Sequence, residues 1–162
     1  KLIIMLFNPI AVFVAALSTF LVGFIWYNPK VFGTIWMQES GMTEEKAKQG
    51  NMAKIFGLTL IYSVLIAFTM PQFVIHQVGV LQVVNGDETN QAFVEFMKIV
   101  GDNHRSFGHG ALHGFIIGLL FILPITAING LFEQKSWKYM LVTGGYWIVS
   151  LTIMGSIICG WK

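Results

Sequence analysis

The four histidines of the chain are the residues whose chemistry and spacing first suggest a functional site. His109 and His113 are four positions apart, so they share one face of a helix. His104 lies just before that helix, and His76 ends an earlier apolar segment. Neutral imidazole is a common ligand of transition metals and of haem iron. His76, His109 and His113 are therefore candidate cofactor ligands, and His104 is a further candidate for a metal site.

A simpler interpretation of the same histidines is that they are polar residues at a membrane surface, bonded to backbone, water or lipid headgroups. Nothing in their spacing sets the rotation of one helix against another, so ligand geometry does not follow from the sequence. We prefer this interpretation, which involves no metal and no cofactor. The HExxH motif is not formed because Gly110 occupies the position of its glutamate, so metalloprotease chemistry lacks its general base.

Four apolar segments carry or flank these residues, and each is long enough to cross a bilayer as a helix. Hydrophobic residues make up 55% of the chain and charged residues 11%, against about 25% in soluble domains. We predict an all-α membrane protein, a single domain with four transmembrane helices in a bundle and two short interfacial amphipathic helices near residues 30–37 and 90–100. The second of these helices lies within an extended polar connection, 77–106. The predicted spans are about 8–27, 55–76, 107–129 and 139–160.

Prolines mark where these helices start and bend. Asn8 and Pro9 form a typical helix start, with asparagine as the cap and proline in the first turn. Pro71 interrupts the second span and is expected to free the Ala67 carbonyl. A neighbouring helix or the Thr69 hydroxyl is expected to satisfy that carbonyl.

The charges flanking the spans predict an orientation in the membrane. An alternating topology puts both termini and the 77–106 connection on one side. The other side carries more basic residues, which the positive-inside rule assigns to the cytoplasm. We therefore expect a bacterial inner-membrane protein with both termini outside the cytoplasm. The basic residues compared are Lys30, Lys46, Lys48, Lys54, Lys135 and Lys138 on the cytoplasmic side, and Lys1, Lys98, Arg105 and Lys162 on the other.

Small residues recur every fourth position in the third span. Such a ridge lets another helix backbone approach closely and gain packing contacts in lipid. We expect the partner to be another helix of the same chain, with small residues of the fourth span as the matching surface. The predicted ridge is Ser106, Gly110, Gly114 and Gly118, and the predicted matching residues are Gly145, Ser156 and Gly160.

Two stretches of the chain resemble a known family. Residues 23–37 read Gly-Phe-Ile-Trp-Tyr-Asn-Pro-Lys-Val-Phe-Gly-Thr-Ile-Trp-Met, and residues 41–45 read Gly-Met-Thr-Glu-Glu. Residues 129–133 read Asn-Gly-Leu-Phe-Glu, followed by Trp137-Lys138, Gly144-Gly145-Tyr146-Trp147 and Met154-Gly155. Together these stretches resemble the bacterial membrane family called domain of unknown function 1761, over nearly the whole chain apart from its middle segment. The resemblance implies a four-helix inner-membrane protein and brings no activity, substrate or catalytic residue.

The remaining features exclude some functions and leave three hypotheses. A net charge of +2 without a basic run gives no basis for nucleic-acid binding. The spacing of reactive residues suggests no catalytic set, so we do not expect an enzyme. Our leading hypothesis is a non-enzymatic accessory or structural subunit that packs against a larger membrane complex or against itself. The alternatives are a metal- or haem-binding electron-transfer component that uses the histidines, and a lipid- or quinone-binding module.

Overall fold

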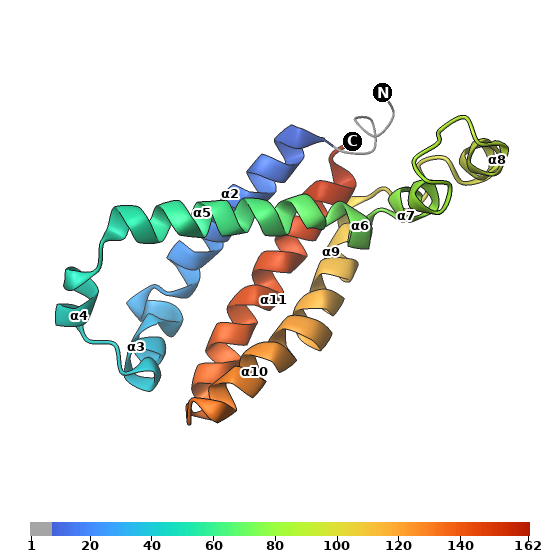
Figure 1. Ribbon diagram of the computed structural model, residues 1–162. Coiled ribbons are helices and arrows are strands. Elements are labelled where there is room, and N and C mark those ends of the chain that lie inside the picture. The colour runs from blue at the N-terminus through green and yellow to red at the C-terminus, as the bar shows by residue number, and fades with distance from the viewer. Residues whose placement is uncertain (1–7) are drawn as a thin grey trace.

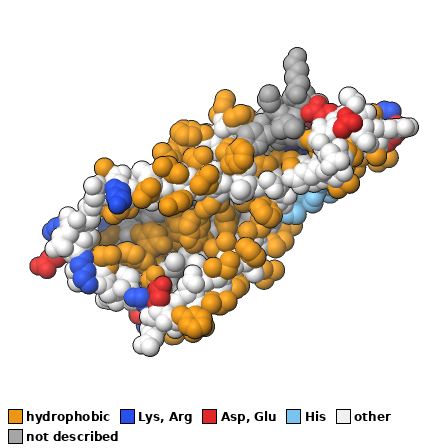
Figure 2. Space-filling model, viewed as in Figure 1, with side chains coloured by type: hydrophobic (Ala, Val, Ile, Leu, Met, Phe, Trp, Pro, Cys, Tyr) orange, Lys and Arg blue, Asp and Glu red, His pale blue; other side chains and the backbone are white. Residues whose placement is uncertain are grey.

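The computed structural model describes residues 8–162, and within this range every regular element is helical. Four of these helices are long and apolar enough to cross a membrane, which confirms the predicted fold class. They run over Pro9–Trp26, Met52–Val74, Phe107–Phe132 and Trp137–Gly160. Apolar side chains cover much of the visible surface between two charged ends (Figure 2), an arrangement that indicates a lipid bilayer environment.

The first span is the helix α2 (Pro9–Trp26), and its start follows from its cap. The Asn8 side chain accepts hydrogen bonds from the backbone N–H groups of Ile10 and Ala11, at 3.0 and 3.1 Å. Beyond α2, a π-helical turn, η1 (Pro29–Gly33), leads into α3 (Thr34–Ser40). These two elements occupy the position of the first expected interfacial helix. The basic residue Lys1, which enters the charge comparison, lies outside the described residues.

The second span consists of α5 (Met52–Thr69) and α6 (Pro71–Val74), and it begins after the short helix α4 (Glu44–Gln49). At the proline, the Met70 backbone N–H is shared between the carbonyls of Ile66 and Ala67, at 3.2 and 3.3 Å. The Thr69 hydroxyl instead donates to the Ile66 carbonyl at 2.8 Å. The expected role of Thr69 was therefore wrong, because the shared backbone N–H of Met70 pairs Ala67.

The chain turns sharply at Ile75, whose backbone is extended (φ −120°, ψ 103°). A separate helix, α7 (His76–Val83), starts directly after it. The span thus ends at Val74, two residues before the expected position, and His76 belongs to the next element. No helix was expected over residues 76–83 from the sequence.

Helices α7 and α8 (Gln91–Val100) form a hairpin that projects beyond the end of the bundle (Figure 1). Its small core consists of Leu81 and Phe93, which are 5% and 1% exposed. The connection between the second and third spans is therefore folded upon itself.

The third span is continuous but changes its winding. It contains α9 (Phe107–Ile117), the π-helical turn η2 (Gly118–Ile122) and α10 (Leu123–Phe132). Pro124 in the first turn of α10 has no N–H to donate, and a π-helical turn is a common way to accommodate such a loss. This span runs alongside α11 (Trp137–Gly160), the fourth span, over its length (Figure 1).

Glycines of α9 and η2 face α11 at close range. A methyl group added at Gly110 or Gly114 would overlap the carbonyl groups of Gly155 or Leu151, respectively. A methyl group at Gly118 would lie 2.6 Å from the Ile148 Cα atom. These positions therefore bring two helix backbones together where no side chain fits.

Of the other predicted small residues, Ser106 and Gly145 lie outside the contact between the third and fourth spans. Ser106 is exposed and caps α9 by accepting the backbone N–H of His109 at 3.2 Å, so it lies outside the helix contact. Gly145 faces the first span, since an added methyl group would lie 2.9 Å from the Trp26 ring. Gly160 faces Phe107 at the start of α9, and Ser156 is half-buried. The matching surface of α11 is formed mainly by Ile148, Leu151 and Gly155, because these residues share one helix face.

We predict that Gly114→Leu destabilises the protein. The added side chain must push the α9 and α11 backbones apart, and overpacking of this kind costs about 1–3 kcal/mol or more. The midpoint of thermal unfolding in detergent should fall by on the order of 5 °C. Gly57→Leu is the matched control, since Gly57 lies in a span with nothing within 4 Å of an added methyl group. Equal midpoints for the two variants would show that the close contact contributes no stability.

Candidate histidine site

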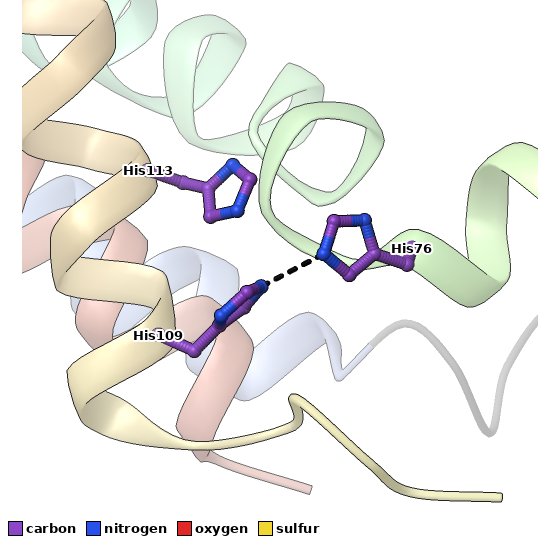
Figure 3. A group of neighbouring side chains, drawn as sticks. All are labelled: His76, His109 and His113. Carbon is purple, nitrogen blue, oxygen red and sulfur yellow. Dashed lines mark hydrogen bonds between the residues drawn. The ribbon is translucent and has the colours of Figure 1, made fainter. Parts of the chain in front are cut away.

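Three histidines from two helices converge at the end of the bundle (Figure 3). His76 is the first residue of α7, while His109 and His113 lie on consecutive turns of α9. One ring nitrogen from each lies within 4.8 Å of the others. The Nε2 atoms of His76 and His109 are 2.9 Å apart and share a hydrogen bond. The structure thus brings together the three residues that were named from the sequence as candidate cofactor ligands.

Local structure accounts for the positions of these rings. The Ser106 cap starts α9 so that His109 and His113 follow on one face. The break at Ile75 redirects the chain, so His76 faces α9 instead of continuing along the span. The His76 ring centroid lies 4.9 Å from that of His109 and 5.2 Å from that of His113.

The same break brings backbone close to the third ring. The backbone of Phe73, in the last turn of α6, lies near the His113 ring. Carbonyl groups in the last turn of a helix lack partners within that helix. A ring that donated one N–H to such a carbonyl would keep the lone pair of its other nitrogen available, as metal-ligating histidines do.

The fourth histidine borders the cluster from the loop that leads into α9. The His104 ring centroid lies 5.0 Å from that of His109 and 5.7 Å from that of His76. His104 does not belong to the three-nitrogen group. Its backbone has a positive φ of 67°, a region that residues other than glycine seldom adopt.

Hydrogen bonds on both sides of His104 hold this loop in place. The Gln77 Nε2 atom donates to the carbonyls of Gly101 and Asn103, at 2.7 and 3.2 Å. The Arg105 Nε atom donates to the Cys159 carbonyl at 3.0 Å, and the Cys159 thiol donates to the His104 carbonyl at 3.3 Å. Arg105 also places a positive charge at the C-terminal end of α11, which favours the helix dipole.

The residues that hold the loop were not expected from the sequence to contribute to a site. Gln77 is 1% exposed and Arg105 is 7% exposed. Both were treated as ordinary polar residues of a membrane-surface connection. The adjacency of Gln77 to His76 is the only signal in the sequence, and it does not predict burial.

The geometry of the cluster favours a single ion over a haem group. In a tetrahedral site with metal–nitrogen bonds of about 2.0–2.1 Å, ligand nitrogens lie about 3.3 Å apart. The observed separations, from 2.9 Å to at most 4.8 Å, bracket that value. A porphyrin needs a flat slot between its axial ligands. Here the His76 ring packs edge to face against the other two, whose own rings are tilted with centroids 4.5 Å apart, and these contacts leave no such slot.

The cluster lies at a surface. His76 is exposed, and His109 and His113 are half-buried. Figure 2 shows the histidines at the molecular surface where the apolar belt meets the projecting hairpin. The rings are therefore accessible from outside the protein without a rearrangement of the bundle.

The fold and the cluster define a small helical membrane protein that carries a group of histidines at one end of its four spans. Comparison with known proteins identifies the family to which the chain belongs. The chain belongs to the family described as a protein of unknown function (DUF1761), whose model matches residues 10–159. This match confirms the resemblance found in the sequence. No curated protein and no solved structure matches the chain.

We predict that Gln77→Ala loosens the loop beside the histidines. The variant loses two hydrogen bonds to the carbonyls of Gly101 and Asn103, each worth about 0.5–1.5 kcal/mol. Amide hydrogen exchange in residues 101–106 should accelerate by about tenfold or more. Gln82→Ala removes an exposed glutamine from the same helix and should leave this exchange unchanged. Equal protection in both variants would mean that Gln77 does not hold the loop.

Proposed function

We propose that this protein binds one transition-metal ion through His76, His109 and His113. The observation that supports the proposal is the convergence of one nitrogen from each ring within 4.8 Å, from helices that belong to different spans or connections. The nearby backbone of Phe73 adds support, because its carbonyl would orient the His113 ring as an outer-shell partner orients a metal ligand.

The donor atoms indicate which ions the site would accept. Three neutral imidazoles suit Zn²⁺, Cu²⁺ and Ni²⁺, whereas Mg²⁺ and Ca²⁺ prefer oxygen ligands. Three protein ligands also leave a coordination position for water or another group, the pattern of sites that exchange ligands. We infer a divalent ion of the zinc or copper type, bound where water has access.

A bound ion would also join parts of the chain that are otherwise weakly connected. The hairpin formed by α7 and α8 meets the bundle through the turn at Ile75 and the loop before α9. An ion shared by His76 and the two histidines of α9 would fasten the base of this hairpin to the third span. Metal binding would then stabilise the folded state by mass action.

We predict that the purified protein binds about one equivalent of Zn²⁺ or Cu²⁺. The protein should carry no polyhistidine tag, and binding should be measured in detergent by competition with a chelating dye. His113→Ala should weaken binding by more than the 10- to 100-fold that loss of an outer-shell partner causes. All four histidines of the chain belong to the cluster or border it, so a tight site without them would contradict the proposal. Gln82→Ala is the control and should bind as the wild type does.

The affinity should fall at acid pH. An imidazole must lose its proton to bind a metal, and its ordinary pKa is about 6.5. Protons therefore compete with the ion for the ring nitrogens as the pH falls, so the affinity should decrease toward acid pH. A constant affinity between about pH 7.5 and pH 5.5, on either side of that pKa, would mean that the ion binds elsewhere.

A second role rests on the lateral surface of the bundle. Large apolar side chains are exposed along α5, among them Ile55, Ile61 and Leu65. This surface suits lipid, and it also suits the apolar face of another membrane protein, as an accessory subunit or a homo-oligomer requires. Co-purification in a mild detergent tests this role. Recovery as a monodisperse monomer without a partner would count against it.

The side of the membrane on which the site lies remains a prediction. The distribution of basic residues would place the histidine cluster and the hairpin outside the cytoplasm of a bacterial cell. Such a position would expose the site to ions from the environment or from the periplasm.

A further inference from the structure

His104 is one of three non-glycine residues with a positive φ among the described residues, and it alone of the three lies beside the histidine cluster. Its backbone φ of 67° lies in the left-handed region, where a side chain is strained and glycine is favoured. A nearby glycine of the loop, Gly101, also has a positive φ, of 50°. The His104 ring lies beside the cluster, with centroids 5.0 Å from His109 and 5.7 Å from His76.

The surroundings of His104 maintain this conformation. Its own carbonyl accepts the Cys159 thiol and the Ser106 backbone N–H, at 3.3 and 3.1 Å. The residues before and after it are tied down by Gln77 and by Arg105, which bonds the end of α11. Strain persists in a folded protein only where the surroundings impose it, and it gathers at functional sites.

We propose that His104 is the fourth ligand of the metal site. The inference rests on the proposed function, which supplies the ion and the other three ligands. The ring of His104 packs against two of those ligands, so the proposal requires only that one of its nitrogens turn toward the ion when the ion binds. The completed site is a tetrahedral four-nitrogen site with three ligands on regular helices and one on a strained turn.

The position of His104 also determines how strongly it would bind the ion compared with the other three histidines. His109 and His113 are held by a helix. His104 is exposed and its backbone is strained, so its bond to the ion is the weakest of the four. The position that it fills is therefore where an external ligand enters.

Cobalt substitution distinguishes three ligands from four. The full-length protein in detergent is loaded with Co²⁺, whose visible absorption bands report the coordination number. The wild type should show the intense bands of a tetrahedral site. His104→Gly, which suits the positive φ, should still bind one equivalent but with an affinity lower by about 10- to 100-fold, and its bands should change. Free imidazole should restore the wild-type spectrum of this variant by occupying the space of the lost ring.

Two further variants separate the loss of a ligand from the relief of strain. His104→Asn keeps a residue that tolerates the left-handed conformation and should also lose affinity. Asn85→Gly relieves a similar positive φ, of 56°, in the hairpin turn and should leave the affinity and spectrum unchanged. Wild-type affinity and spectrum in both His104 variants would overturn the assignment of His104 while leaving the three-histidine site intact. A wild-type protein that binds no Co²⁺ or Zn²⁺ would overturn the proposed function and this inference together.

Discussion

The close backbone contact between α9 and α11 is the interaction on which the rest of the structure depends. Gly110 and Gly114 face α11 at a distance that excludes any side chain. This contact determines how α9 is rotated about its axis. His109 and His113 each precede one of these glycines, about 100° around the helix, so they point away from α11 and toward the end of the second span. The glycines thus orient the histidines without touching them.

A second constraint on the structure is hydrogen bonding of the backbone in the second span. In a bilayer every N–H and carbonyl needs a partner, and a helix that is interrupted must find new ones. Met70 pairs with Ile66 and Ala67 at the proline, and the backbone of Phe73 beyond it lies near the His113 ring. The interruption therefore has two results. It turns His76 toward α9, and it brings the end of the second span beside another ring.

Hydropathy and helix caps predict most of this fold, because the four apolar segments and the Asn8 cap are local properties of the sequence. The helix over residues 76–83 was missed because His76, Gln77 and Gly79 show no apolar periodicity. The spacing of the histidines could suggest a cluster but could not establish one, since the cluster depends on the rotation of α9 and on the turn at Ile75. The partners of Gly145 and Ser106 were assigned wrongly for a related reason. A small residue indicates that something can approach closely, and it does not indicate which element approaches.

The π-helical turn η2 has a consequence for the phase of the third span. Gly118 and Gly130 are twelve residues apart, which in an uninterrupted α-helix would place them roughly 120° apart around the axis. A π-helical turn absorbs about one extra residue, and the remaining eleven positions return Gly130 to within roughly 20° of Gly118. Gly130 indeed faces α11, since an added methyl group there would lie 2.9 Å from the Met140 side chain. The wide turn thus acts as a phase correction, and it allows one helix with a single-residue insertion to present the same edge to its neighbour from end to end.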